Sequence, residues 1–234
     1  AKGAPLLNYP SRKTRFYIDG FNLYYGALKG TPYKWLNLGT FAQSLVPNEQ
    51  IDEIEYFTAK VQDRSGQEGA AARQSAYLQA LETSTVPIRT IFGLFKVRET
   101  RMWVADTQKC NKTKKMRETM DVCECCARNT IEVVKTEEKG SDVNLAVSLV
   151  KDAFLQRFEL AVVISNDSDM QSAIDIAMKE LELPVIVVNP SRAKPDSLRG
   201  TKQLRVKEFA LRRNQFNNRL ILPNGHVLTK PQDW

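Results

Sequence analysis

Two short segments that are apolar at every position except the last constrain the fold more than any other feature of the sequence. Residues 160–165 read LAVVIS and residues 184–189 read PVIVVN, and a stretch of helical length separates them. A strand with one solvent-exposed face alternates apolar and polar residues, whereas a continuously apolar strand suits a sheet that is covered on both faces. The two segments therefore predict neighbouring strands of a mainly parallel sheet between two layers of helices.

Further strands and helices extend this alternation along the chain. Strands are predicted at residues 15–19, 54–61 and 87–95, and helices at residues 67–83, 142–158 and 169–181. Strands that alternate with helices of this length are typical of a doubly wound α/β sheet. The predicted fold class is α/β, with a doubly wound, mainly parallel sheet flanked by helices.

Two segments do not fit the alternation. Residues 98–130 form a basic, cysteine-bearing insertion that is too long for a simple connection between a strand and a helix. Residues 191–234 form a basic C-terminal extension, in which Asn224-Gly225 between two apolar runs predicts a hairpin. The domain itself is expected over residues 14–190. No apolar run reaches the length that a membrane helix needs, and no signal-peptide core follows the first residues, so a cytoplasmic protein without a membrane partner is expected.

The net charge of +7 is distributed unevenly. Residues 1–15, 96–117 and 192–234 together carry an excess of seventeen positive charges, and the rest of the chain carries an excess of ten negative charges. An acidic centre framed by basic segments suits a carboxylate site that acts on a polyanion, although a solubility pattern gives the same count. The residues predicted to bind this polyanion are Lys112, Lys114, Lys115, Arg212 and Arg213.

Carboxylates follow two of the predicted strands directly. Asp19 ends the first strand and is followed by Gly20 and Asn22, while Asp167 and Asp169 come just after LAVVIS. The carboxyl ends of parallel strands lie at one edge of a sheet, where ligands of α/β proteins bind. Asp142 begins a helix whose apolar stripe points to the core, so it is expected beside the same edge.

Each of these acids has a purely structural explanation, because Asp before or within the first turn of a helix is a common cap. Three separate groups that converge on one edge are better explained by a shared cation, since adjacent carboxylates repel each other. Oxygen ligands suit Mg²⁺ or Mn²⁺, which can activate a water and bind a phosphate oxygen. The sequence thus predicts a metal site of Asp19, Asp142, Asp167 and Asp169, with Asn22, Ser165 and Asn166 positioning water or phosphate.

Three segments resemble the motifs of NYN domains, the PIN-like nucleases, and occur in the order of that family. They are YIDGFN at residues 17–22, EKGSDVNLA at residues 138–146 and VISNDSD at residues 163–169. The resemblance implies a PIN-like sheet and a metal-dependent ribonuclease, and it assigns catalytic roles to the matching positions Asp19, Asn22, Asp142, Asp167 and Asp169. Asn166 is a departure, since many such domains have Gly there.

The four cysteines are clustered in the insertion rather than spread along the chain as in a disulfide framework. Cys110, Cys123, Cys125 and Cys126 could hold a structural zinc ion, but their spacing is irregular and unliganded thiols are the alternative.

Three functions are compatible with these features. The first is a metal-dependent endoribonuclease with RNA as its partner; the second is an inactive RNA-binding or scaffold protein; the third is a phosphoesterase acting on DNA or small nucleotides. Tyr33, Trp35 and Trp103 are candidates for stacking on bases, with a place in the core as the alternative. The sequence does not indicate an oligomeric state.

Overall fold

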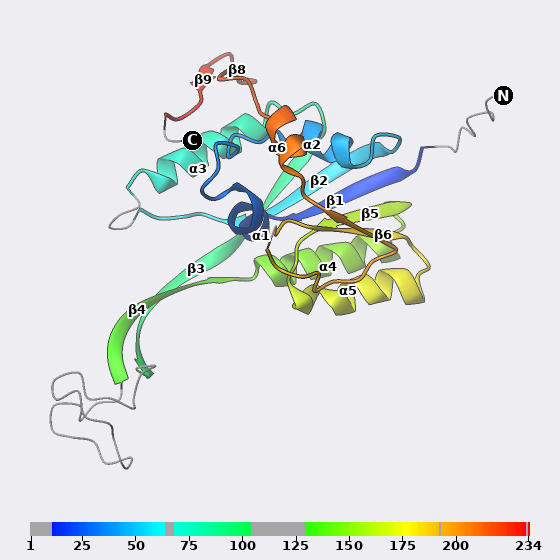
Figure 1. Cartoon of the computed structure of the whole chain (residues 1–234), viewed down its shortest axis with the longest axis horizontal. Helices are drawn as coiled ribbons and strands as arrows, with labels where there is room; N and C mark the ends of the chain where they lie inside the picture. Colours follow the sequence, from blue (N-terminus) through cyan, green and yellow to red (C-terminus); the bar gives the residue numbers. More distant parts are fainter. Residues whose placement is uncertain (1–10, 64–67, 104–129, 192, 233) are drawn as a thin grey trace, which may run out of the picture. The chain divides into compact units, whose positions relative to one another are not determined.

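A seven-stranded sheet forms the centre of the protein in the computed structural model, which describes residues 11–63, 68–103, 130–191, 193–232 and 234. Its strand order is β4-β3-β2-β1-β5-β6-β7 (Figure 1). The strands are β1 (Lys13–Asp19), β2 (Gln50–Ala59), β3 (Ile88–Trp103), β4 (Thr130–Lys139), β5 (Leu160–Ile164), β6 (Val185–Asn189) and β7 (Lys202–Arg205). The pairings from β3 through to β7 are all parallel, which confirms the predicted fold class.

The two apolar segments occupy central positions in this sheet. Every residue of β5 and of β6 is buried, and β5 pairs with β1 on one side and with β6 on the other. Side chains of successive residues point to opposite faces of a strand, so burial at every position means that both faces are covered. The continuous apolar pattern was therefore a sound guide to the parallel core.

Helices of two groups cover the two faces. On one face, α4 (Ser141–Phe154), α5 (Gln171–Asp175) and the π-helical turn η4 (Ile176–Glu180) pack against alternate residues of β1, β5 and β6 (Figure 1). On the other face lie α1 (Gly20–Leu23), the π-helical turn η1 (Tyr24–Leu28), α2 (Leu38–Leu45), α3 (Ala70–Leu81) and α6 (Glu208–Arg213). Burial of apolar side chains on both faces supplies most of the favourable free energy of folding.

The segment predicted as a C-terminal extension contributes to the main unit. β7 pairs with β6 in parallel and continues the sheet beyond residue 190. The predicted hairpin is present as β8 (Arg219–Ile221) and β9 (Val227–Thr229), with Gly225 at a positive φ of 83° between them. The ring of Trp234 packs against Trp35, 5.8 Å between centroids. The C-terminal residues thus fold back onto the core.

The chain divides into two units, residues 1–94 with 140–234 and residues 95–139. In the second unit, β3 continues to Trp103 and β4 begins at Thr130, so two strands extend into the segment predicted as a basic, cysteine-bearing insertion. Residues 104–129 lie outside the described part of the chain, and with them the cysteines and lysines predicted to bind zinc and RNA. None of the described helices is long and apolar enough to cross a bilayer.

Candidate active site

Asp19 ends β1 and caps the helix that follows. Its Oδ1 accepts a hydrogen bond from the backbone N–H of Asn22 at 2.9 Å, which satisfies a free donor in the first turn of α1. A close approach of neighbouring atoms requires Gly20, because a Cβ at this position would lie 2.7 Å from the carbonyl oxygen of Phe57 and 2.8 Å from the Tyr56 ring. The sequence Asp-Gly thus places an acid at the edge of the sheet where no larger residue could follow it.

Two side chains hold the second oxygen of Asp19. Asn22 Nδ2 donates to Oδ2 at 2.7 Å, and Ser165 Oγ donates to the same atom at 3.2 Å. The amide oxygen of Asn22 in turn accepts from the backbone N–H of Asn166 at 3.4 Å. Both ends of the Asn22 amide are therefore fixed, and the residues after β1 and after β5 meet as predicted.

Asp167 belongs to the same group through Ser165. The backbone N–H of Asp167 donates to Ser165 Oγ at 3.2 Å, so this hydroxyl links the two acidic segments. Oδ1 of Asp167 accepts from the backbone N–H of Asp169 at 3.1 Å and caps the short 3-10 helix η3 (Ser168–Met170). Asp167 therefore has the capping role that was considered for it. Only Oδ1 takes part in the cap, and Oδ2 does not.

The electrostatics of Asp19 are those of a crowded acid. The side chain is buried, with 7% of the residue exposed, and this burial raises the pKa of its carboxyl. The hydrogen bonds from Asn22 and Ser165 lower the pKa in part, while the negative charge of Asp167 raises it further. A cation near the two carboxylates would remove both the burial penalty and the repulsion.

The donors present at this edge are carboxylate, hydroxyl and amide oxygen atoms, which are the ligands that Mg²⁺ and Mn²⁺ prefer. Asp19 accepts three hydrogen bonds, whereas a carboxylate has about four acceptor positions, so a position remains for a further partner. Mg²⁺ usually keeps several waters and takes only one or two protein carboxylates. Asp19 and Asp167 are two such carboxylates, and Asp167 lies near enough for its charge to raise the pKa of Asp19. Among the described residues, however, no three Asp, Glu, His or Cys side chains come close enough to share one ion.

Asp142 and Asp169 thus occupy the predicted elements without completing a four-carboxylate cluster. Asp142 is half-buried in the first turn of α4, and its Oδ1 accepts from the backbone N–H of Val143 at 2.8 Å. Asp169 is exposed at the start of η3. Both acids therefore stay predicted ligands, and Asp19 with Asp167 forms the part of the site that the described contacts assemble.

Asn166 has a structural role that its sequence position did not reveal. Its Nδ2 donates to the carbonyl of Pro195 at 3.0 Å, and its Oδ1 accepts from the backbone N–H of Ser197 at 2.9 Å. These bonds tie the loop after β5 to the loop between β6 and β7. The amide is directed to that loop, so the side chain is an anchor rather than a group that orients a phosphate.

Asn189 is a further polar residue at this edge that the sequence analysis missed. It ends β6, is buried, and donates from Nδ2 to Asp196 Oδ1 at 2.7 Å. Asp196 forms an ion pair with Arg205 at the end of β7, 2.8 Å between the charged atoms. A polar residue that closes an apolar strand was the signal used for Asp19, and the same signal was available for Asn189.

Two of the aromatic residues considered for stacking on bases, Tyr33 and Trp35, differ in how far they are buried. Trp35 is fully buried and donates to the carbonyl of Asn217, so of the two alternatives it is a core residue and not a stacking group. Tyr33 is half-buried, and its hydroxyl donates to Glu208 at 3.0 Å. Arg212 and Arg213 are exposed in the last turn of α6, where their charges are available to a polyanion.

Comparisons with known proteins match this chain to one family and to two individual proteins. The model of the family described as NYN domain matches residues 13–204. A Pseudomonas putida protein named 6-hydroxy-3-succinoylpyridine 3-monooxygenase HspA is 28% identical over 248 residues, covering 95% of this chain and 75% of the relative. A crystal structure of a Vibrio parahaemolyticus protein of unknown function covers 85% of this chain and 94% of its own, at 10% identity and a TM-score of 0.46. A likeness at that score carries no functional argument.

Proposed function

The chain belongs to the NYN domain family, and from this premise we propose that it is a metal-dependent endoribonuclease that hydrolyses RNA phosphodiester bonds at the Asp19 edge of the sheet. The observation that carries the proposal is the buried Asp19 carboxylate beside Asp167, at the carboxyl ends of β1 and β5. The choice of RNA rests on the family, whose motifs this chain contains. Membership of the family by itself supports a nuclease-like fold, and the ribonuclease activity is the proposal.

The residues of the site have separate roles in this proposal. Asp19 and Asp167 would hold the ion, and Asp142 and Asp169 are the further acids that the motifs of the family assign to it. Asn22 fixes the orientation of the Asp19 carboxylate and cannot act as a base, because an amide has no basic lone pair at neutral pH. Ser165 keeps the two acidic segments in register by bonding to both.

An ion bound there would supply Lewis acidity and would neutralise charge at the scissile phosphate. The protein's own contribution is to orient the Asp19 carboxylate before the substrate arrives, while the charge of the ion would offset the burial and the repulsion that raise the pKa of Asp19. Three donors on Asp19 fix its plane, so little reorganisation is needed when RNA binds. Water activation by histidine is not required, and the single histidine, His226, lies in the β8–β9 turn away from this edge.

A cleavage assay with a circular single-stranded RNA tests the proposal. Only an endonuclease opens a circle, so linear product in Mg²⁺ or Mn²⁺, and none with a chelator, is the expected result. Matched DNA and mononucleotide phosphodiester substrates distinguish the phosphoesterase alternative, and RNA binding without cleavage distinguishes the scaffold alternative.

The Asp19→Asn variant ties the activity to the site. It removes the charge that binds the ion while the Asn side chain can still cap α1, so we expect a loss of at least about a hundred-fold with the fold retained. Asp63→Asn is the matched control, since Asp63 also accepts backbone N–H bonds, from Gly69 and Ala71, but lies outside the site. Equal cleavage by wild type and Asp19→Asn would refute the assignment.

The Pseudomonas putida relative provides a second candidate function, because the match to it covers nearly the whole chain. Its name describes a monooxygenase, which would consume oxygen and a reductant in the presence of a pyridine substrate. Oxygen uptake with 6-hydroxy-3-succinoylpyridine and a reduced nicotinamide, measured beside the cleavage assay, separates the two. Substrate-dependent uptake without RNA cleavage would favour the monooxygenase.

A further inference from the structure

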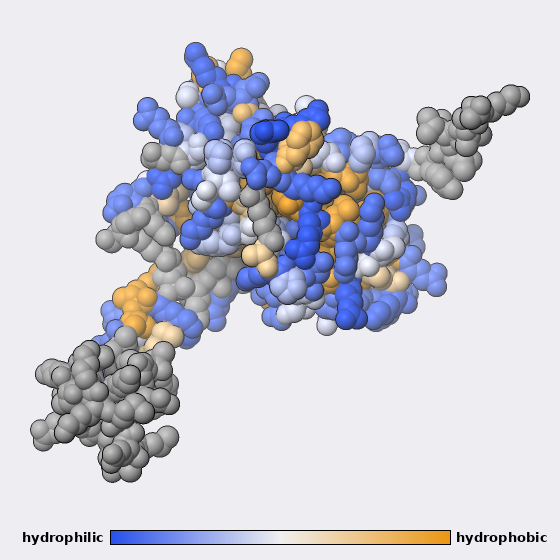
Figure 2. All heavy atoms as spheres, in the orientation of Figure 1, coloured by the Kyte–Doolittle hydropathy of each residue, from blue (hydrophilic) through white to orange (hydrophobic). Residues whose placement is uncertain are grey.

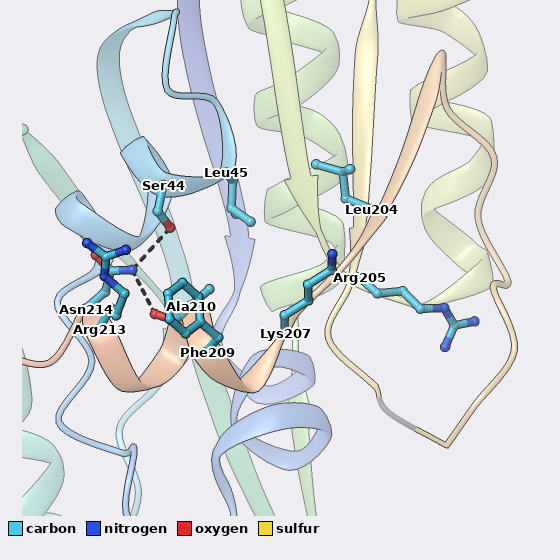
Figure 3. Close-up of a pocket in the computed structure, with 9 residues that line it drawn as sticks. All are labelled: Ser44, Leu45, Leu204, Arg205, Lys207, Phe209, Ala210, Arg213 and Asn214. Atoms are coloured by element: carbon cyan, nitrogen blue, oxygen red, sulfur yellow. Dashed lines mark hydrogen bonds between the residues drawn. The ribbon is translucent and has the colours of Figure 1, made fainter.

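A groove on the α2–α6 face is lined by none of the acids of the site described above. We call it the α6 groove; it has a volume of about 520 Å³. Its lining residues come from the end of α2, the end of β7 and α6: Ser44, Leu45, Leu204, Arg205, Lys207, Phe209, Ala210, Arg213 and Asn214 (Figure 3). All of them belong to one unit of the chain. A cavity of this size holds a ligand as large as a nucleotide.

The lining combines an apolar surface with positive charge. Phe209 is 57% exposed, and Leu45 and Leu204 line the groove beside it. Figure 3 shows Lys207 and Arg213 on either side of the Phe209 ring, and the guanidinium carbon of Arg213 lies 5.2 Å from the ring centroid. Figure 2 shows hydrophobic surface next to hydrophilic surface in the region of α6.

One wall of the groove is rigid. Asn214 Nδ2 donates to Ser44 Oγ at 3.2 Å and to the carbonyl of Ala210 at 2.7 Å, which ties α6 to the end of α2 (Figure 3). A further hydrogen bond holds this wall in place: the backbone N–H of Asn37 donates to the carbonyl of Asn214 at 2.8 Å. A preformed wall reduces the entropy that a ligand must overcome on binding.

The register of the sheet connects the groove with Asp19. Four residues align across neighbouring strands: Ile18 pairs with Ile164, Ile164 with Val188, and Val188 with the groove residue Leu204. The next residue on the first and last of these strands is Asp19 and Arg205, respectively. Three strand spacings separate β1 from β7, about 14 Å in total. A few nucleotides of single-stranded RNA cover that distance.

We propose that the α6 groove binds one nucleotide of single-stranded RNA, displaced by a few positions from the phosphate at Asp19. In this inference, which rests on the proposed ribonuclease function, the base stacks on Phe209 while Lys207 and Arg213 bind the adjacent phosphates. A double helix is a poorer occupant, because its bases are already stacked on each other and cannot reach an aromatic ring inside a groove. The combination of an exposed ring and cations is what single-strand binding requires.

Binding of a labelled single-stranded RNA by the full chain tests the inference, with Asp19→Asn in every protein so that the RNA stays intact. We expect Phe209→Ala to raise the dissociation constant about ten-fold, as for loss of one base-stacking contact. The double variant Lys207→Ala/Arg213→Ala should raise it by a similar factor. Lys202→Ala is the matched control, because it removes a positive charge from the other end of β7, outside the groove.

An abasic scan of the RNA then locates the stacked base. A single abasic substitution, a few nucleotides from the cleaved bond, should weaken binding by the parent protein about ten-fold and have little effect on Phe209→Ala, because the two changes remove the same contact. The thermal midpoints of all variants should match, since the substituted side chains are exposed.

The inference is overturned if the parent protein has no affinity for the RNA, or if the groove variants bind it as tightly as Lys202→Ala does. Equal sensitivity of the parent protein and Phe209→Ala to every abasic substitution also overturns it. Failure of the proposed function has a different signature, because the wild-type protein would then leave RNA uncut in Mg²⁺ and Mn²⁺ whatever the groove variants bind.

Discussion

Asp19 is subject to two opposing influences at the end of β1. Burial and the charge of Asp167 raise its pKa, and the donors of Asn22 and Ser165 lower it in part. The sequence predicted this residue because an acid followed by Gly closes an apolar strand. It could not predict the contacts of Asn166, because they involve a loop about thirty residues further along the chain.

The raised pKa of Asp19 leads to a pH-dependent difference between wild type and Asp19→Asn. A carboxyl whose pKa is higher in the folded state stabilises the protein below its unfolded pKa, and this contribution is lost as the pH rises through the folded pKa. In the absence of metal, the variant should therefore gain stability relative to wild type as the pH rises from about 4 toward 7. Thermal unfolding in chelator across this range measures the difference. Parallel curves would contradict it.

Replacing Asn166 separates its anchoring role from chemistry. Asn166→Ala removes the two side-chain bonds to the 195–197 loop and keeps the backbone N–H bond to Asn22, so we expect a loss of about 1 kcal/mol in the free energy of unfolding. Faster amide hydrogen exchange should be confined to residues 194–199. Asn217→Ala, at an exposed asparagine, is the control. An unchanged exchange rate in the loop would show that the anchor is not needed.

At the scale of elements, the sequence revealed the strands that are buried on both faces and missed α2, β4 and β7. α2 was missed although Asn37 caps it and Leu38, Phe41, Ala42 and Leu45 follow at helical spacing. β7 carries no apolar run, because three of its four residues are exposed at one end of the sheet. An edge strand of this kind is specified by its pairing with β6 rather than by its own side chains.

Asp152 joins α4 to β1 at the opposite end of the strand from Asp19. It is 1% exposed and accepts from Arg15 at 2.7 Å, from the Tyr17 hydroxyl at 3.0 Å and from Arg157 at 3.0 Å. Asp152→Ala leaves the Tyr17 hydroxyl buried without this acceptor, so it should destabilise the protein by about 3 kcal/mol. Urea unfolding at equilibrium measures the loss.

Two comparisons make the Asp152 prediction specific. Asp175→Ala removes an exposed ion pair with Lys179 and should change the urea midpoint little, since exposed pairs contribute little to stability. Cleavage by Asp152→Ala well below its unfolding temperature should stay near the wild-type rate, because Asp152 lies outside the candidate site. A loss of activity larger than the loss of folded protein would assign Asp152 a role beyond packing.

At the scale of the whole molecule, the charge distribution separates binding from chemistry. The acids of the site lie in the part of the chain with an excess of ten negative charges, while the flanking segments carry an excess of seventeen positive charges. α6 belongs to such a flank, and its Arg212 and Arg213 lie within 6 Å of the exposed Phe209 ring. The sequence showed that this segment is basic, but only the fold shows that Arg213 lines the α6 groove.

The salt dependence of RNA binding tests whether the positive charge of α6 is in contact with phosphates. Lys and Arg that neutralise phosphates release counterions, and each contact to a single strand contributes about 0.7 to the slope of log affinity against log salt. Replacing Arg212 and Arg213 together should therefore weaken binding several-fold and flatten the slope by about 1.4.

The double variant Lys179→Ala/Lys202→Ala is the control. It removes the same charge from exposed positions outside α6 and should leave the slope nearly unchanged. Since the net charge is equal in the two variants, a difference between their slopes identifies local contact, whereas equal slopes would mean that the basic flank acts only through its overall charge.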